Sequence, residues 1–339
     1  MLPRLAHALP VLFVASSLAA QTSSASTTID QFGNGCQGPN GLLTGGVAGA
    51  ATITVDYDAA TGIANVTVEN TSPPVAGEAT AVITEVYLNV PPGAVTSASL
   101  LSQTAAGGAA PTFSLSFDAD TGAAPNANGV ACLGAFNLGF DNGNGAHRAI
   151  ANAAATSISA PDPVIGPVVF ELQLVGPGTG GIDADSILAS FSRNAPAHEA
   201  NAAVKFQAAG VGGEESGFVG SSDLCRTAVY IVGEPRIGET IDLCVTGGTG
   251  CHVCIWVSEI PGPFATPFGV IPVGLPILLN LDLGNLGLAG IGNPACIPVS
   301  IPNEPGLISY TLYLTNLTYF APMPTGLSFS PAYTLTILG

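Results

Sequence analysis

The stretch ATITVDYDAATGIANVTVEN, residues 51–70, decides the fold class of this chain. Ile53, Val55 and Tyr57 alternate with polar residues, the turn-forming segment DAATG follows, and IANVTVEN resumes the alternation. Apolar side chains at every second position, bounded by Asp and Gly, are typical of antiparallel strands with one buried face. The segments AVITEVYLNVPPG, TFSLSFDADTG and GPVVFELQLVGPG repeat the pattern. The sequence therefore predicts an all-β protein.

The composition of the chain changes at a glycine-rich segment, QAAGVGGEESGFVGSSD, residues 207–223. Acidic sequence rich in Asn and Ala precedes it, and sequence dense in Pro, Leu and Ile follows it. We predict two antiparallel β-sandwich domains in tandem, of jelly-roll or immunoglobulin-like type, at residues 21–228 and 229–339. The alternative is a long loop inside one large sandwich. Short helices could form at HRAIANAAAT (147–156) and NAPAHEANAAVKF (194–206), although Asn and Pro weaken both.

Residues 1–20, MLPRLAHALPVLFVASSLAA, have the pattern of an export signal. Arg4 precedes an apolar run that begins near Ala8, and the small residues Ser17 and Ala19 suit a cleavage site after Ala19. A transmembrane anchor, the alternative, needs about 20 apolar residues, and the run is shorter. We therefore expect a signal peptide that is removed and a secreted protein, located outside the cell or in the cell envelope.

The chain is acidic, with 6 Lys and Arg against 23 Asp and Glu and a formal net charge of −17. Such a surface repels nucleic acid and favours cations or basic partners. A second apolar stretch, residues 268–292, is interrupted by Pro, Asp and Gly, so we expect no transmembrane segment after removal of the signal. The expected partners are envelope or matrix components, or glycans.

Seven cysteines in an exported chain indicate disulfides. In CVTGGTGCHVC, residues 244–254, Gly247 and Gly248 suit a two-residue hairpin turn. Such a hairpin would place Cys244 opposite Cys251 at disulfide distance, so we predict that these two are bonded. Cys254 is then expected to pair with Cys296 and Cys36 with Cys132, which leaves Cys225 over.

The same stretch has an alternative interpretation as a zinc site. Cys244, Cys251, His252 and Cys254 offer the atoms that zinc prefers. However, strand alternation places His252 and Cys254 on one face and Cys251 on the other, so the four ligands would not converge. A thioredoxin-like role for CHVC would need a helix N-terminus, whereas the following IWVS has strand character. Structural disulfides are the favoured interpretation.

Acidic turns are the candidate sites for calcium, which takes about six to eight oxygen ligands. Asp118 and Asp120, in DADTGAAPNANG, are the foremost candidates. No turn completes the Asp-x-Asp-x-Asp-Gly loop with its distal Glu. Turn acids also accept hydrogen bonds from their own backbone, which is the alternative interpretation for each. The further candidates are Asp56 and Asp58, Asp141 with Asn142 and Asn144, and Asp183 with Asp185.

Sequence signals of catalysis are few. The chain has no Gly-x-Ser-x-Gly motif, and HEANA at His198 lacks the second His of a zinc protease. We therefore expect a non-catalytic protein with a structural or adhesive and binding role outside the cell. One alternative is a secreted hydrolase with its site near Asp118, Asp120 and His147. The other is a glycan-binding module that would use aromatic groups from Trp256, Tyr310, Tyr313, Tyr319 and Tyr333.

The C-terminal part of the chain has a family likeness. GEPRIGETIDLCVTGG, IPNEPGLISYTLYLTNLTY and GLSFSPAYTLTILG follow one another within residues 233–339. They resemble a recurrent C-terminal β-module of exported bacterial proteins, which implies β-architecture and export but no activity. More loosely, NVTVENTSPPVAG and AVITEVYLNVP resemble the ectodomains of PEP-CTERM-type exported proteins. The chain ends in TLTILG instead of their Pro-Glu-Pro sorting signal, so membrane sorting by that route is not implied.

Overall fold

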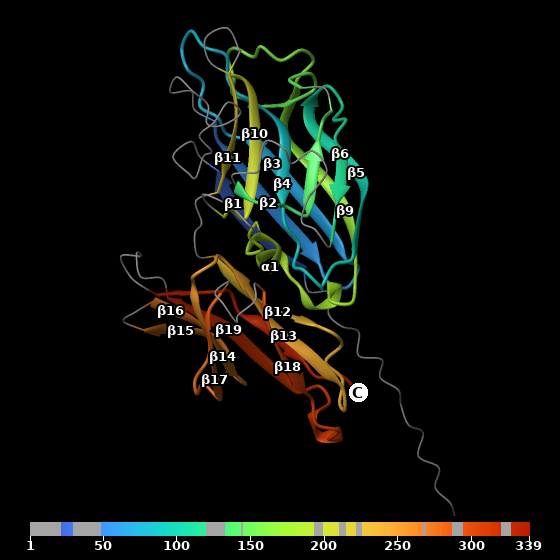
Figure 1. Ribbon diagram of the computed structural model, residues 1–339, viewed down its shortest axis with the longest axis vertical. Helices are drawn as coiled ribbons and strands as arrows, with labels where there is room; N and C mark the ends of the chain where they lie inside the picture. The colour runs from blue at the N-terminus through green and yellow to red at the C-terminus, as the bar shows by residue number, and fades with distance from the viewer. Residues whose placement is uncertain are drawn as a thin grey trace, which may run out of the picture.

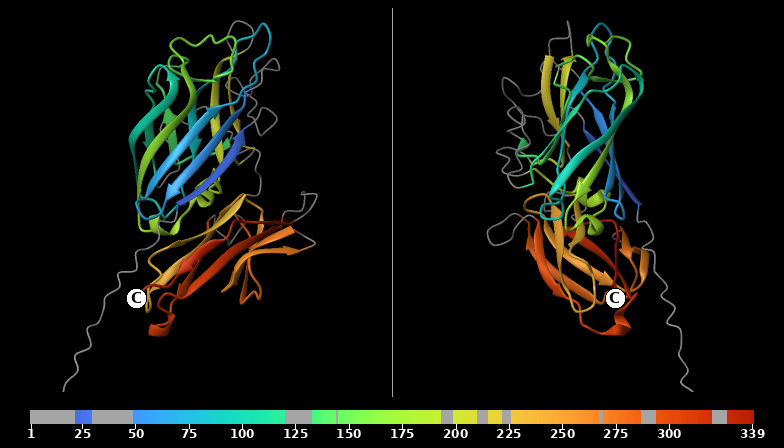
Figure 2. Two further views of the ribbon diagram at one scale, coloured as in Figure 1. Left: turned by 180° about the vertical axis from the view of Figure 1, so that it is seen from behind. Right: turned by 90° about the vertical axis from the view of Figure 1, so that its right-hand side faces the viewer.

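A computed structural model of the chain consists of two blocks of β-strands, one above the other in Figure 1. Figure 2 shows the same two blocks from behind and from the side. The predicted signal peptide lies outside the described residues. The structure describes residues 22–29, 49–119, 133–143, 145–192, 199–209, 215–221, 226–266, 269–286, 294–319 and 327–339.

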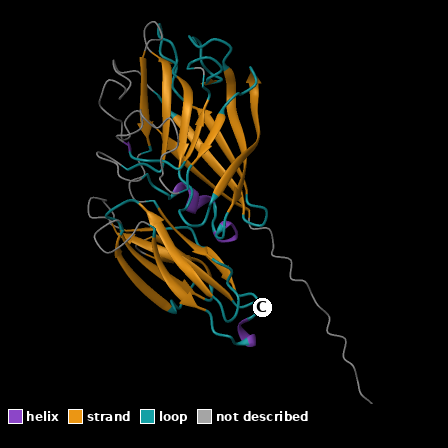
Figure 3. Ribbon diagram, turned by 45° about the vertical axis from the view of Figure 1, so that its right-hand side comes forward, coloured by secondary structure: helices purple, strands orange, loops and turns teal. Residues whose placement is uncertain are grey.

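The protein is all-β, as the alternation of residues 51–70 predicts, with a few short helical segments (Figure 3). The N-terminal unit, as we call the first block, contains β1 (Thr22–Ile29), β2 (Ala51–Asp58), β3 (Ile63–Asn70), β4 (Val82–Leu88), β5 (Ser97–Gly108), β6 (Ser114–Phe117), β7 (Leu138–Asp141), β8 (Ile150–Ala151), β9 (Val164–Val175), η4 (Thr179–Gly181), α1 (Ala184–Leu188), β10 (Ala202–Ala209) and β11 (Glu215–Gly220). The C-terminal unit contains β12 (Thr227–Val232), β13 (Thr240–Gly247), β14 (His252–Ser258), β15 (Pro261–Thr266), β16 (Gly269–Val273), β17 (Leu279–Asn285), β18 (Ala295–Ser300), η6 (Pro305–Leu307), β19 (Thr311–Tyr319), β20 (Leu327–Phe329) and β21 (Tyr333–Thr336).

All strands of the N-terminal unit belong to one sheet with the order β1-β2-β3-β9-β8-β4-β10-β11. Strand β5 pairs with β9, β7 pairs with β4, and β6 pairs with β7. The short β8, parallel to β9 and antiparallel to β4, joins the two halves of the sheet. Apolar side chains from both halves form one core cluster, which includes Val55, Phe140, Phe170 and Val204. The period-two pattern therefore buries one face of each half against the other.

The described strands of the C-terminal unit form three sheets. These are β12-β13-β18, then β17-β14-β19-β20 with β21 paired to β19, and the hairpin β15-β16. The core lies between the first two sheets, where Ile231 and Leu243 of one sheet join Ile255 and Leu314 of the other in a single cluster. In the part of the chain that the structure describes, no strand of this unit pairs with β1–β11.

The disulfide of the C-terminal unit differs from the prediction. Cys244 of β13 lies opposite Cys296 of β18 and is bonded to it. The predicted Cys244–Cys251 hairpin is wrong because β13 and β14 belong to different sheets, so the glycines between them connect two layers. The predicted Cys254–Cys296 pair is also wrong, since Cys254 is a free thiol, whereas Cys251 is disulfide-bonded. The predicted Cys36–Cys132 pair and Cys225 lie outside the described residues.

The segments with helical character do not form helices where the structure describes them. Residues 147–156 contain β8, whose two side chains are fully buried, and residues 202–206 belong to β10. Helix α1 forms instead after Asp183, whose Oδ1 accepts a hydrogen bond from the Ser186 N–H at 2.7 Å. The Ser186 hydroxyl accepts in turn from the Asp183 N–H at 2.8 Å, which completes a capping box. Capping and tertiary contacts therefore override the helix propensity of the alanine-rich segments.

The two units meet where η4 and α1 lie against β12. An added Cβ at Gly181 would lie 2.3 Å from the Ile231 carbonyl oxygen, so only glycine permits this close approach. Arg226 donates a hydrogen bond to Asp185 Oδ1 at 2.7 Å. Tyr230 of β12 belongs to the core cluster of the N-terminal unit. The junction is thus both packed and hydrogen-bonded.

Candidate metal-binding site

His252 and Cys254 lie on the outward face of β14 in the five-stranded sheet of the C-terminal unit. Val253 and Ile255, which alternate with them, are buried in the core of this unit. Because successive side chains of a strand point to opposite faces, His252 and Cys254 face away from that core. The expectation that these two residues share one face is confirmed.

A β-bulge in the neighbouring edge strand β17 brings Asp282 to the same face. His252 lies opposite Asn285 and Cys254 lies opposite Asp282, with a register shift between the two pairs. Without that shift, Asp282 and Asn285 would point to opposite faces, because they are three positions apart in the strand. Gly284 has a φ of 75°, a left-handed conformation that glycine adopts at little cost and that suits a bulge. Its N–H donates to Asp282 Oδ1 at 2.9 Å and so orients the carboxylate.

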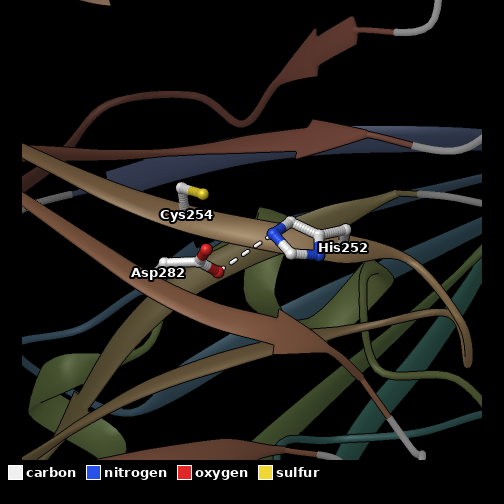
Figure 4. Close-up of side chains that lie close together, drawn as sticks. All are labelled: His252, Cys254 and Asp282. Carbon is white, nitrogen blue, oxygen red and sulfur yellow. Dashed lines mark ion pairs between the residues drawn. The ribbon is translucent and has the colours of Figure 1, made fainter.

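The side chains of His252, Cys254 and Asp282 lie close together (Figure 4). His252 Nε2 is 2.9 Å from Asp282 Oδ1, and His252 Nδ1 is 2.9 Å from Asn285 Oδ1. One donor atom from each of the three residues lies within 4.8 Å of the other two. The side chains of His252 and Asp282 are 39% and 63% exposed, so the cluster is open to solvent.

This arrangement does not suit an activated cysteine nucleophile. Burial, and then the neighbouring Asp282 carboxylate, raises the pKa of the Cys254 thiol, whereas reactive cysteines have a lowered pKa. Both ring nitrogens of His252 already have partners, so neither is placed to take the thiol proton. An imidazole nitrogen, a sulfur and a carboxylate oxygen within reach of one another are instead a donor set for a transition metal.

The zinc interpretation of the sequence named two of these donors and missed the third. Cys244 and Cys251 are disulfide-bonded and therefore cannot be ligands, which leaves His252 and Cys254. Asp282 was missed because it comes from another strand and depends on the bulge. The only sequence signal would have been the Asp-x-Gly segment in LDLGN, which marks a place where a strand can bulge.

Two of the candidate calcium turns use their carboxylates on groups of their own turn. Asp58 accepts hydrogen bonds at 2.9 Å from the Ala60 N–H and from the Thr61 hydroxyl. Asp141 accepts from the backbone of its own turn in the same way, at 2.8 Å. Asp118 is half-buried after β6, and its N–H donates to the Asn137 carbonyl oxygen at 3.0 Å. Asp120 and Asn144 lie outside the described residues, and calcium binding stays a prediction.

The structure does not bring Asp118 and His147 together. Asp118 directly follows β6, whereas His147 lies beyond the far end of the antiparallel partner strand β7. The two residues are therefore at opposite ends of this pair, roughly 10 Å or more apart. His147 Nε2 lies 3.5 Å from Asp162 Oδ2, in an exposed pair. Asp120 and His198 lie outside the described residues.

The aromatic side chains that suggested glycan binding are spread over different environments. Tyr333 is buried in the core of the C-terminal unit. Trp256 is half-buried on the outward face of β14, with its ring centroid 5.6 Å from that of Phe329. Tyr319 is 51% exposed, and the hydroxyl of the exposed Tyr310 donates to Glu259. Tyr313 is half-buried on β19.

Two comparisons of the sequence with known proteins give no relative. No protein-family model matches the chain, and no curated protein sequence matches it significantly. The likeness of residues 233–339 to a module of exported bacterial proteins therefore stays a prediction. Within the described residues, no helix is long and apolar enough to cross a membrane.

Proposed function

We propose that this protein is an exported, non-catalytic protein that binds components of the cell envelope or the extracellular matrix through its C-terminal unit. The export pattern of residues 1–20 and the acidic composition support a location outside the cytoplasm. The binding role depends on a single observation, the distribution of exposed apolar side chains.

Exposed large apolar side chains gather in the C-terminal unit. Among the described residues, three lie in the N-terminal unit and nine in the smaller C-terminal unit. Six of these nine belong to the segment from the end of β14 to the start of β17, which we call the apolar segment: Ile260, Phe264, Val270, Leu275, Leu278 and Leu279. Soluble proteins seldom expose many apolar groups in one place unless another molecule covers them.

The apolar segment is also uncharged. Residues 260–281 contain no Asp, Glu, Lys or Arg, although the whole chain carries a net charge of −17. The hairpin β15-β16 within this segment lies at one side of the C-terminal unit in Figure 1. Acidic groups elsewhere repel the anionic surfaces of cells, so contact through this neutral segment avoids that repulsion. Because the segment is both apolar and uncharged, it suits adhesion to a neutral surface.

A matched pair of double variants tests the proposal. Val270→Ser with Leu279→Ser removes side chains that are 58% and 47% exposed. Leu101→Ser with Val175→Ser removes the same two residue types in the N-terminal unit, each 52% exposed. Cells producing each form are fractionated into cytoplasm, envelope, matrix and medium. We expect the ratio of protein in the medium to protein in the envelope or matrix to be about tenfold higher for the first double variant than for wild type. This ratio corresponds to a loss of about 1.4 kcal/mol of binding free energy.

The second double variant should distribute as wild type does. Equal release of both double variants would show that the apolar segment is not the binding surface. Wild-type protein that stays in the cytoplasm with residues 1–20 attached would contradict export itself.

A further inference from the structure

We propose that His252, Cys254 and Asp282 bind a zinc ion. This site goes beyond the proposed adhesive function and does not depend on it. The three residues offer a nitrogen, a sulfur and an oxygen from two adjacent strands, all within 4.8 Å of one another. Zinc is held in proteins by these three kinds of atom.

Only small changes in the distances between the three ligand atoms are needed to reach the geometry of a zinc site. Metal–ligand lengths of about 2.0–2.1 Å for nitrogen and oxygen and about 2.3 Å for sulfur place the ligands of a tetrahedral zinc ion about 3.3–3.6 Å apart. His252 Nε2 and Asp282 Oδ1, now 2.9 Å apart, would separate slightly to admit the ion between them. The Cys254 sulfur, which lies within 4.8 Å of a ring nitrogen of His252 and of a carboxylate oxygen of Asp282, would move inward by rotation of its side chain. The backbone of the two paired strands can remain in place.

The surroundings prepare His252 to act as a ligand. Its Nδ1 lies 2.9 Å from Asn285 Oδ1, a carbonyl-type oxygen that can only accept a hydrogen bond. Because Nδ1 faces this acceptor, Nε2, which now contacts Asp282, is the ring nitrogen left to coordinate the metal. Histidines that bind metals almost always donate their other ring N–H in this way. Asp282 is likewise held, by the Gly284 N–H at 2.9 Å.

The donor set and exposure favour zinc over calcium or magnesium. Calcium and magnesium bind through oxygen atoms, whereas a thiolate and an imidazole select zinc and related metals. The thiolate of Cys254 and the carboxylate of Asp282 together neutralise a divalent ion. Because Asp282 is 63% exposed, water or an external ligand can occupy the fourth position. A thiol of this kind would otherwise be open to oxidation outside the cell.

Metal titration of the purified, exported full chain tests the site. Cobalt(II) reports thiolate ligation through a sulfur-to-metal charge-transfer absorption, and zinc should displace it. We expect a stoichiometry of one zinc ion per chain and protection of Cys254 from alkylation when zinc is bound. Cys254→Ser should abolish the charge-transfer absorption, and Asp282→Asn should weaken zinc binding at least tenfold. Asn285→Ala should weaken it about tenfold, because it removes the partner that orients His252.

A matched control comes from the other His–Asp pair. His147 lies 3.5 Å from Asp162 on the N-terminal unit. His147→Asn should leave zinc binding and the cobalt absorption unchanged, whereas His252→Asn should weaken binding at least tenfold. Absence of a charge-transfer absorption, equal zinc binding by wild type and Cys254→Ser, or a Cys254 that joins two chains through a disulfide would each overturn the proposal.

Discussion

The two units of this protein bury apolar surface to very different extents. Among the described residues, the core cluster of the N-terminal unit has 35 buried residues, including two from the C-terminal unit, whereas that of the C-terminal unit has 15. The larger cluster contains four phenylalanines, and the rings of Phe140 and Phe170 stack with centroids 4.2 Å apart. In the part of the chain that the structure describes, the smaller cluster contains no phenylalanine and a single aromatic residue, Tyr333. The C-terminal unit therefore has less hydrophobic stabilisation available.

The smaller core is accompanied by a covalent link and by exposed apolar groups. The Cys244–Cys296 bond joins β13 to β18 within the sheet that covers one side of the C-terminal core. Small cores in exported proteins are commonly supplemented by disulfides in this way. The apolar side chains that the C-terminal unit leaves exposed are then free to contact other molecules. We infer that the N-terminal unit is the stable support and the C-terminal unit the binding part.

The largest expected effect comes from removing the disulfide. Replacing Cys244 and Cys296 together by Ala should lower the free energy of unfolding of the C-terminal unit by about 4 kcal/mol, because the bond is formed over a sequence separation of 52 residues. Urea unfolding followed by the fluorescence of Trp256, the only Trp, reports on this unit. In the presence of a chelator that removes zinc, Cys254→Ser, which removes a free thiol, is the control and should leave the midpoint unchanged. A double variant as stable as wild type would mean that the C-terminal core stabilises its unit without help from the disulfide.

The next effect concerns the N-terminal unit, which contains the single lysine of the chain in a half-buried position. Lys205 is 24% exposed and pairs with Glu85, which is 10% exposed and also accepts a hydrogen bond from Tyr87. Lys205→Met should destabilise this unit by about 3 kcal/mol, because it leaves the Glu85 charge buried and unpaired. Adding Glu85→Gln should restore most of the loss, since no charge then remains. Circular dichroism during urea unfolding measures the free energy of unfolding of both variants. Equal values for the single and the double variant would show that the unpaired Glu85 charge is not the cause of the destabilisation.

The smallest effect tests the junction between the units. Burial, and to a lesser degree the nearby Asp185, raises the pKa of Asp183 to about 6, from about 3.9 in an unfolded chain. The folded protein therefore binds this proton more tightly, and its stability falls as the pH rises from about 4 to about 6. Asp183→Asn keeps an N-cap and resembles the protonated form. We expect Asp183→Asn to raise the free energy of unfolding by about 1–2 kcal/mol at pH 7.5 and to leave it unchanged at pH 4. The gain at pH 7.5 is limited because Asp183 is partly exposed.

Thermal unfolding at these two pH values measures the difference. A stabilisation of the same size at both would indicate a packing effect, and no stabilisation at pH 7.5 would show that the charged form of Asp183 costs nothing at the junction.

Much of the fold could be read from local patterns. Residues 51–70 form the paired strands β2 and β3 with Val55 opposite Val66, as their alternation indicates, because a half-buried strand repeats every two residues whatever surrounds it. The same rule placed His252 and Cys254 on one face. Local rules failed where the partner is distant. Ile150 and Ala151 form a strand because β4 and β9 lie on either side of them, which no local signal records.

Only part of the candidate site could be predicted from the sequence, because its third residue comes from a distant strand. Two of its ligands are neighbours in the sequence, but Asp282 joins them only because β17 pairs with β14 and bulges at Gly284. The glycines at 247 and 248 suit a hairpin by themselves, but the strands on either side of them, β13 and β14, pair within two different sheets. Cys244 is therefore bonded to Cys296 of β18, the neighbour of β13.

The sequence by itself determined the all-β class, the buried face of strands such as β2 and β14, and the acidic character of the chain, since these depend on the backbone period and on composition. The tertiary structure alone decided which strands are neighbours, which cysteines are bonded, and that an aspartate completes the His–Cys pair. Those outcomes depend on contacts between residues far apart in the chain, whose free energies are gained only when the sheets have assembled.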